Sequence, residues 1–316
     1  MNHWVMDYET LINMFGAVFQ HYKTGETKQF VVHRLRNDIV DLIKFLNDNK
    51  QNDEWHISYN GLNFDSQITE YILRNQEELV NLDALTIANA LYTFAQSVIE
   101  KTNNNEFPPF APRDLSIKQI DVFKLNHWDN PAKRSSLKWI QYSMDWYNIQ
   151  EMPIHHSTMI NTMAQINEVM DYCVNDVESC RQIMILSKSQ INLRQNLTKE
   201  YGIDLYNASE PRIAKELFLH FLSKKTGIKK HELKLLRTVR DKIKVKDIIL
   251  PYINFQRPEF KDILQKFNEL EIDPNNTKNG FKYSVMHKGV RTDFGLGGVH
   301  GARSSGIYEA KDGMLS

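Results

Sequence analysis

The chain has 316 residues, of which 41% are hydrophobic and 25% charged, and it contains 16 Phe, 13 Tyr and 5 Trp. This length and apolar content exclude a disordered chain, a collagen and a mini-protein, and they allow one large domain or two ordinary ones. Basic and acidic residues number 39 each, so the zero net charge predicts no bulk attraction to polyanions. Any binding of nucleic acid must come from local patches.

The cysteines and the apolar pattern indicate the compartment. Cys173 and Cys180 lie two helical turns apart in one helical run, which forbids a disulfide between them and favours a reducing compartment. No window approaches 18 uncharged apolar residues, and two early acids interrupt the stretch where a signal peptide needs apolar residues. We therefore expect an intracellular, cytoplasmic protein with no membrane partner.

Strand and helix patterns alternate along the first part of the chain. The expected strands are 3–6, 29–35, 56–60 and 117–125, and the expected helices are 37–48, 68–73 and 160–190. Because such alternation is typical of α/β architecture, we expect an α/β domain over residues 1–190. From about residue 191 the pattern becomes polar and helical, which predicts a mainly helical extension over 191–316.

The net charge of the whole chain is zero, but the N-terminal part is acidic and a segment of the C-terminal part is basic. Residues 1–100 hold seven Lys or Arg against fourteen acids, whereas residues 224–246 hold ten Lys or Arg against two acids. The basic segment has two interpretations, a solvated helical face or a patch that follows phosphates. Of these two interpretations we favour the phosphate patch.

Three short patterns place carboxylates at the ends of expected elements. Asp7 and Glu9 stand two apart at a strand end, so the pleat points both to one face. Asp65 opens the helix after Y-N-G-L-N-F, while Tyr172 and Asp176 are four apart and share a helix face. Each alone has an ordinary explanation: a solvated pair, a helix N-cap, or chance. Their combination within one α/β domain predicts a metal site.

The succession of D-x-E on a strand, N-x-x-x-F-D after a strand, and Y-x-x-x-D on a helix resembles the Exo I, Exo II and Exo III motifs of the DEDD superfamily of 3′–5′ exonucleases, in the subtype with Tyr in the third motif. The resemblance implies a ribonuclease-H-like fold, with a mixed central sheet and flanking helices. It also implies two divalent ions, Mg²⁺ or Mn²⁺, which together activate a water and stabilise the leaving 3′-oxygen.

The same resemblance implies a role for each motif residue. Asp7, Glu9 and Asp176 would hold the ion that presents the nucleophile. Asp7 would also bridge to the second ion, which Asp65 would bind directly or through water. Tyr172 would orient the attacking water. These five residues are the expected catalytic set, and the four carboxylates are the expected metal ligands.

Further residues match positions that contact nucleic acid in the relatives. Asn60 and Phe64 match positions lining the channel for the 3′-terminal nucleotides, and Leu11 is expected either to pack on the terminal base or to lie in the core. Ser136 and Leu137, in S-S-L-K-W, are similar to an element that contacts single-stranded primer in protein-primed phage polymerases, with a helix cap and a core leucine as the alternative. Those relatives also use a catalytic lysine between the second and third motifs, whose position the sequence leaves open.

Two longer stretches, 123–157 and 295–309, resemble phage-type replicative DNA polymerases, with family B as the first assignment and family A as the alternative. In these polymerases such a Gly-rich segment comes shortly before the first polymerase motif, an Asp followed by S-L-Y-P, and the sequence ends at Ser316 short of it. We therefore expect a proofreading exonuclease domain over 1–190 and, over 191–316, a helical basic lead-in to a polymerase domain of the same protein.

The expected substrate is single-stranded DNA or the 3′ end of a primer–template in a phage-infected bacterial host. Two other functions remain open at this point. One is a free-standing DEDD exonuclease acting on RNA or DNA. The other is an inactive nucleic-acid-binding module, against which the presence of all five motif residues argues.

Overall fold

The computed structural model of the chain describes residues 3–126, 135–236, 238, 240–273, 282–295, 298–304 and 306. The chain divides into two compact units, Met1–Gly227 and Ile228–Ser316. The expected boundary at residue 190 falls within helix α8 (Lys188–Tyr201), and both α8 and α9 (Glu210–Thr226) belong to the first unit. Parts of the polymerase-like stretches, residues 127–134 and 307–309, lie outside the described residues, as does the end of the chain up to Ser316.

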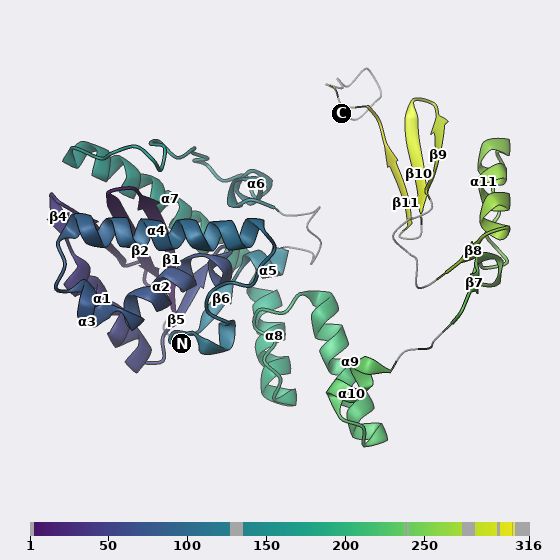
Figure 1. Ribbon diagram of the computed structural model, residues 1–316, viewed down its shortest axis with the longest axis horizontal. Helices are drawn as coiled ribbons and strands as arrows, with labels where there is room; N and C mark the ends of the chain where they lie inside the picture. The colour runs from purple at the N-terminus through teal and green to yellow at the C-terminus, as the bar shows by residue number, and fades with distance from the viewer. Residues whose placement is uncertain are drawn as a thin grey trace. The chain divides into compact units, whose positions relative to one another are not determined.

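The first unit is built on a six-stranded mixed sheet (Figure 1). Its strands are β1 (His3–Leu11), β2 (Met14–His21), β3 (Thr27–His33), β4 (Arg36–Asn37), β5 (Trp55–Ser58) and β6 (Gln119–Asp121). They lie in the order β4-β3-β2-β1-β5-β6. The first four strands pair antiparallel, and β5 and β6 continue the sheet in parallel on the other side of β1.

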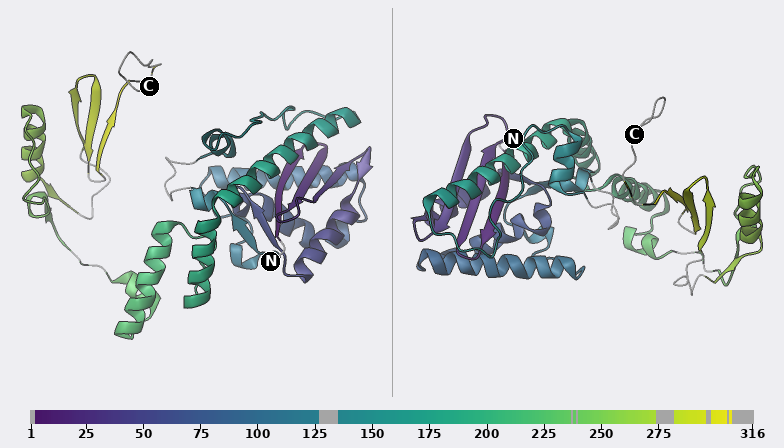
Figure 2. Two further views of the ribbon diagram at one scale, coloured as in Figure 1. Left: turned by 180° about the vertical axis from the view of Figure 1, so that it is seen from behind. Right: turned by 90° about the horizontal axis from the view of Figure 1, so that it is seen from above.

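Helices cover both faces of this sheet. The helices of the first unit are α1 (Ile39–Gln51), η1 (Gly61–Asn63), α2 (Asp65–Arg74), α3 (Gln76–Leu79), α4 (Ala84–Asn103), η2 (Pro112–Asp114), α5 (Phe123–Asn126), α6 (Leu137–Ser143), α7 (Met163–Leu186), α8 (Lys188–Tyr201) and α9 (Glu210–Thr226). Helices α1, α2 and α4 pack on one face with one core cluster, and α7 packs on the other face with a second. Figure 2 shows the purple strands between the blue helix α4 and the teal helix α7. The architecture is thus a three-layer α/β sandwich.

Successive side chains of strand β1 point alternately into the two core clusters on opposite faces of the sheet. Trp4, Met6 and Tyr8 enter the cluster beneath α1, α2 and α4, whereas Val5 and Leu11 enter the cluster beneath α7. The residues between Val5 and Leu11 on this second face are the acids of D-x-E. Both carboxylates therefore belong to the face that α7 covers.

The carboxyl end of β5 leaves room beside β1. The parallel pairing of the two strands ends at Val5 and Ile57, while β1 continues to Leu11. Beyond Ser58 the chain turns through η1 into α2. This geometry brings the loop after β5 and the first residue of α2 next to the second half of β1.

The turn after β5 is tightly specified. Asn60 adopts the left-handed conformation with φ 64°, which Asn tolerates better than most residues. A Cβ on Gly61 would lie 1.8 Å from Ser58 Oγ, so only glycine fits there. The buried Asp121 carboxylate at the end of β6 accepts hydrogen bonds from the backbone N–H groups of Asn60 (2.7 Å) and Leu62 (3.3 Å).

The expected α/β class is confirmed, and several element boundaries differ from the expected ones. The first strand runs to Leu11 rather than residue 6, and the expected long helix ends at Leu186 before α8 begins at Lys188. Strand β2 and helix α4 were not expected. Seven of the eight residues of β2 are buried, so its sequence lacks the alternation that identifies a half-buried strand.

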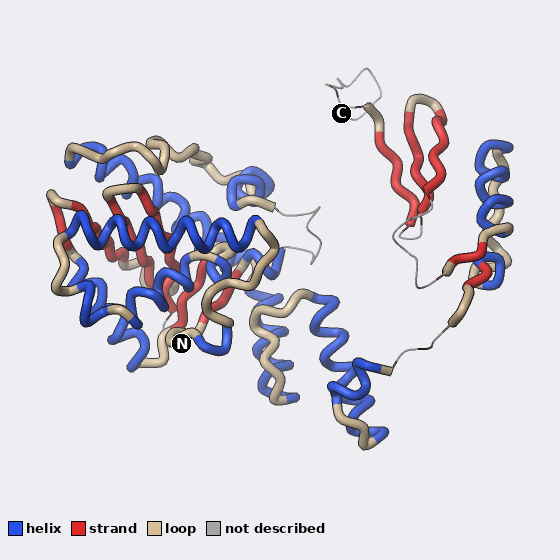
Figure 3. Tube along the Cα trace, viewed as in Figure 1, coloured by secondary structure: helices blue, strands red, loops and turns tan. Residues whose placement is uncertain are grey.

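The second unit combines short helices and strands. Its elements are α10 (Lys230–Leu235), β7 (Ile243–Lys244), η4 (Val245–Asp247), α11 (Pro258–Asn268), β8 (Glu271–Ile272), β9 (Lys282–His287), β10 (Val290–Gly295) and β11 (Gly298–Ala302). Figure 3 distinguishes its helices from its strands by colour. The antiparallel sheet β11-β10-β9 was not part of the expected helical extension. Lys288 (φ 49°) and Gly289 (φ 77°) give the turn between β9 and β10 the two positive φ angles of a type I′ hairpin.

No helix in the described part of the chain combines the length and the apolar composition needed to cross a lipid bilayer.

The close contact at Gly61 makes the turn after β5 a sensitive point for stability. We expect Gly61→Ala to lower the free energy of unfolding by about 1–3 kcal/mol, the usual range for overpacking. Denaturant unfolding measures this. Adding Ser58→Gly removes the opposing side chain, so the double variant should lose less stability than the sum of the two single variants. Strictly additive losses would contradict the contact.

Candidate active site

The structure brings together the four predicted carboxylates from three separate elements. Asp7 and Glu9 come from β1, Asp65 from the first residue of α2, and Asp176 from the middle of α7. The pKa of Asp7 lies well above its usual range because of burial, and then because of repulsion by Asp65, Glu9 and Asp176. Repulsion of this kind requires proximity, so the four predicted carboxylates lie near one another in the fold.

Asp65 has the features of a cation ligand. Its side chain is buried, and the backbone N–H of Tyr8 donates to its carboxylate. The other oxygen, Oδ1, is buried and has no hydrogen-bond partner among the described residues. Burial raises the pKa of Asp65 to about 7. A buried carboxylate oxygen without a donor is costly unless a cation binds it.

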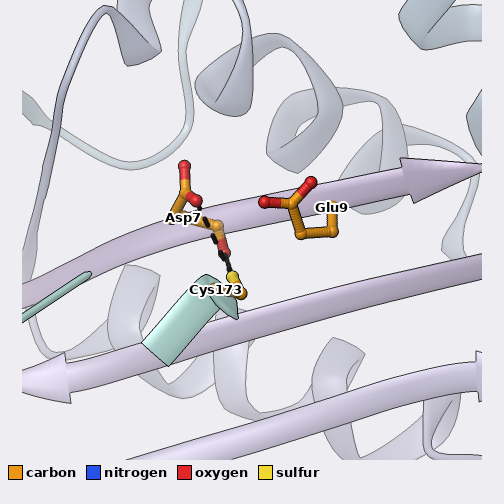
Figure 4. A group of neighbouring side chains, drawn as sticks. All are labelled: Asp7, Glu9 and Cys173. Carbon is orange, nitrogen blue, oxygen red and sulfur yellow. Dashed lines mark hydrogen bonds between the residues drawn. The ribbon is translucent and has the colours of Figure 1, made fainter. Parts of the chain in front are cut away.

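The strand residues and one cysteine of α7 form the tightest group (Figure 4). One ligand atom each from Asp7, Glu9 and Cys173 lie within 4.8 Å of one another. The Cys173 thiol donates to the backbone oxygen of Asp7 at 3.4 Å and lies 3.7 Å from its Oδ2. Burial raises the pKa of Glu9 to about 8, with further repulsion from Asp176 and Asp65.

Helix α7 carries Tyr172 and Asp176, the two residues of the predicted third motif. Tyr172 and Asp176 lie on one helix face, and the two side chains share a hydrogen bond. Burial, followed by repulsion from Asp176 and Glu9, raises the pKa of Tyr172, so the phenol stays protonated. Burial likewise raises the pKa of Asp176. The phenol is therefore available as a hydrogen-bond donor beside the carboxylates.

Helix α6 contributes two residues that sequence reasoning did not assign. The Lys138 ammonium lies 5.2 Å from the centre of the Tyr172 ring and lowers the pKa values of Glu9 and Asp176. It also donates to Glu151 Oε2 at 2.9 Å. Lys138 is thus a lysine between the second and third motifs beside the acidic cluster. It follows directly after the S-S-L element, which was the available signal.

Gln141 is the second such residue of α6. Its side chain is completely buried, and its Nε2 donates to Asp176 Oδ1 at 2.9 Å and to Ser179 Oγ at 2.7 Å. Trp146 Nε1, just beyond α6, donates to Asn175 Oδ1 at 3.0 Å. These contacts dock α6 and the chain after it onto α7 next to the third motif. No local sequence signal marks them, because they join residues far apart in the chain.

A cavity of about 510 Å³ contains three of the five residues expected to contact nucleic acid. It is lined by Tyr59, Asn60, Asn63, Thr102, Phe123, Lys124, Ser135, Ser136 and Leu137. Ser136 also caps α6, since its Oγ accepts from Trp139 N at 3.1 Å, and Leu137 packs against the second core cluster. The cap and the core contact therefore coexist with the cavity lining.

The structure places the other two expected contacts elsewhere. Phe64 packs, partly buried, against the first core cluster. Leu11 is fully buried in the second cluster, which is its alternative role as a core residue. Neither side chain lines the cavity that holds Asn60.

The donor set suits a hard divalent cation. Four carboxylates, one of them with an unpartnered buried oxygen, provide the oxygen ligands that Mg²⁺ and Mn²⁺ prefer. Comparison with known proteins adds no identification: no family model matches the chain, and a search of the curated proteins finds no match.

The raised carboxyl pKa values predict how the stability of the metal-free protein depends on pH. Between about pH 6.5 and about pH 8 the unfolded chain has already lost these protons, whereas folded Glu9 (pKa about 8) and Asp65 (pKa about 7) are still losing theirs. The folded state therefore binds more protons in this window, and its stability should fall as pH rises. Thermal unfolding in a chelator measures this fall.

Two comparisons isolate the effect. Glu9→Gln should flatten the pH dependence, because the amide does not titrate. Added Mn²⁺ should raise the midpoint of unfolding more at about pH 8 than at about pH 6.5, because ionised carboxylates bind the ion more tightly. Buried His56, with a pKa of about 3, lowers stability only below about pH 6.5 and does not interfere. Identical pH slopes in the variant and the parent would contradict this assignment.

Proposed function

We propose that the chain is a two-metal-ion 3′–5′ exonuclease that proofreads for a phage-type DNA polymerase. It would hydrolyse the 3′-terminal phosphodiester of single-stranded DNA and release deoxynucleoside monophosphates. The observation that carries this proposal is the convergence of Asp7, Glu9, Asp65 and Asp176 on one face of the sheet. The polymerase context rests on the sequence resemblance of residues 123–157 and 295–309.

The arrangement of the sheet supports a ribonuclease-H-like fold. In the first unit an antiparallel group of strands leads through β1 into the parallel strands β5 and β6, with helices on both faces. Two of the carboxylates lie on β1, one lies at the start of α2, which follows β5, and one lies on α7. This is the mixed central sheet with flanking helices that the motif resemblance implies.

The four carboxylates would hold two divalent cations, Mg²⁺ or Mn²⁺. When bound, such a pair supplies an activated water and stabilises the leaving 3′-oxygen. Asp65 contributes a buried oxygen that is free for this purpose, and Gln141 fixes the orientation of the Asp176 carboxylate. The protein thus positions its ligands with hydrogen bonds from β1 and α6.

Two polar groups complete the site. The Tyr172 phenol is protonated and lies beside Asp176, where it would orient the attacking water by a hydrogen bond. The Lys138 ammonium lies next to the Tyr172 ring, where it would attract the scissile phosphate toward an otherwise acidic cluster. Positive charge at this point offsets the repulsion between the carboxylates and the DNA backbone.

Helix α6 and the cavity are suited to binding single-stranded DNA. Asn60, Ser136 and Leu137 line the cavity, and Lys124 provides a cation there. On the outer side of α6 the rings of Trp139 and Tyr142 stack and are 61% and 68% exposed. Aromatic faces of this kind stack on nucleic-acid bases. The same short helix therefore contacts the third motif, lines the cavity and exposes rings to solvent.

A ranking of three variants tests the catalytic assignment. We expect Asp7→Ala and Asp176→Ala to reduce exonuclease activity to background, because each removes a metal ligand. Tyr172→Phe should cost less, within the roughly 10²–10⁴-fold range of a single proton-transfer or positioning group. Single-turnover release of mononucleotides from a 3′-labelled single strand measures all three.

Asp171→Ala is the matched control, since Asp171 is an exposed carboxylate on the same helix. It should keep full activity. A loss in Asp171→Ala equal to that in Asp176→Ala, or residual activity above a few per cent in Asp7→Ala, would overturn the assignment. Cleavage of a circular strand without a 3′ end would show an endonuclease instead.

The cavity predicts an effect on binding without an effect on chemistry. Lys124→Gln should raise KM for single-stranded DNA and reduce the salt dependence of log Kd by about 0.7 per lost phosphate contact, while kcat stays unchanged. Lys118→Gln serves as the control, because Lys118 pairs with Asp53 and does not line the cavity. A salt slope unaffected by Lys124→Gln would remove the cavity from the DNA path.

A further inference from the structure

The cysteine beside the candidate site has no part in the proposed hydrolysis. Cys173 lies on α7 with its thiol against Asp7, and one ligand atom from each of Asp7, Glu9 and Cys173 falls within 4.8 Å of the others. Two-ion hydrolysis by oxygen ligands has no use for sulfur. The question is what the sulfur adds to the site.

We propose that Asp7, Glu9 and Cys173 form a binding site for a thiophilic divalent cation of the Zn²⁺ class, which inhibits the nuclease by occupying it. The inference rests on the proposed function only for the inhibition, because binding of the cation depends on the three side chains alone.

The spacing of the ligands fits such an ion. Zinc binds sulfur at about 2.3 Å and carboxylate oxygen at about 2.0 Å, so two such ligands at the tetrahedral angle lie about 3.5 Å apart. The distance from Cys173 Sγ to Asp7 Oδ2 is 3.7 Å. The sulfur and the carboxylate are therefore already placed as a pair of zinc ligands, without movement of β1 or α7.

The proton of the Cys173 thiol points toward Asp7, into the space that the cation would occupy. The Cys173 thiol donates to the backbone oxygen of Asp7 at 3.4 Å, and its sulfur lies 3.7 Å from Asp7 Oδ2. On binding, the S–H bond breaks, the proton passes to solvent and a sulfur–metal bond forms. One thiolate and two carboxylates then surround a charge of +2.

A second, independent observation indicates a cation here. Asp65 is 2% exposed, and its Oδ1 has no partner in the described part of the chain. The amide of Tyr8, between Asp7 and Glu9 on β1, donates to the same carboxylate. The unpartnered oxygen thus belongs to a carboxylate close enough to repel both Asp7 and Glu9.

Sulfur changes which ion the site prefers. Mg²⁺ requires octahedral oxygen coordination and retains water, whereas thiolate ligands favour Zn²⁺ and similar soft cations. A four-coordinate ion on Asp7, Glu9 and Cys173 would take two carboxylates that hydrolysis needs. Zinc should therefore compete with Mg²⁺ and inhibit.

Cadmium provides a direct test, because a cadmium–thiolate bond gives an ultraviolet charge-transfer band. The full chain, free of metal and DNA, is titrated with Cd²⁺. We expect one equivalent of Cd²⁺ to produce the band in the wild-type chain and in Cys180→Ser, and no band in Cys173→Ser or Cys173→Ala. Cys180 is the matched control, since it is also buried on α7.

Activity is measured separately. In Mg²⁺, Zn²⁺ should inhibit the wild-type nuclease at concentrations at least about tenfold lower than those needed for Cys173→Ser. Absence of the band in the wild-type chain, or its persistence in both Cys173 variants, would overturn the inference whatever the nuclease assay shows. A band that depends on Cys173 in a chain without nuclease activity would instead uphold the metal site and overturn the proposed function.

Discussion

The gathering of four carboxylates around one strand, two of them buried and two half-buried, is the constraint on which the rest of the structure depends. Desolvation and mutual repulsion raise their pKa values, so the ionised carboxylates destabilise the folded state of the metal-free protein, and the surrounding fold must offset this. Asp7 and Glu9 lie on β1, which is an interior strand of the sheet with β2 on one side and β5 on the other. Apolar residues of β1 before and after Asp7 and Glu9 anchor the strand in two separate cores.

Donors from other elements moderate the repulsion without removing it. The backbone amide of Tyr8 donates a hydrogen bond to the Asp65 carboxylate. The Gln141 side chain donates to the Asp176 carboxylate, and the Cys173 thiol donates to the Asp7 carboxylate. Helix α6 provides Gln141 together with the one nearby cation, Lys138, among the described residues that shift these carboxyl groups. Because α6 also lines the cavity, a strand bound there would lie against the element that fixes the third motif. In the proposed function, DNA binding and metal geometry would thus be connected through one short helix.

The sequence is informative where function depends on local spacing. Period two places Asp7 and Glu9 on one face, and a four-residue spacing pairs Tyr172 with Asp176, so both pairs could be predicted. The tertiary contacts of Lys138 and Gln141 could not, because they join α6 to a helix about thirty-five residues away. Strand β2 was missed because an unbroken apolar run has no periodicity, and β9 and β10 because their Lys-Gly turn lies within a polar stretch.

The two cysteines show how neighbouring structure gives a residue its chemistry. Seven residues of helix return to nearly the same face after about 10.5 Å, so Cys173 and Cys180 both point from α7 toward the sheet, and both are buried. Composition and helical pattern therefore treat them alike, as small core residues. Only the sheet distinguishes them, since Cys173 meets the Asp7 carboxylate, whereas Cys180 packs within the second core cluster. The proposed affinity of Cys173 for a metal ion would therefore depend on the strand opposite the helix, which no pattern within the helix encodes.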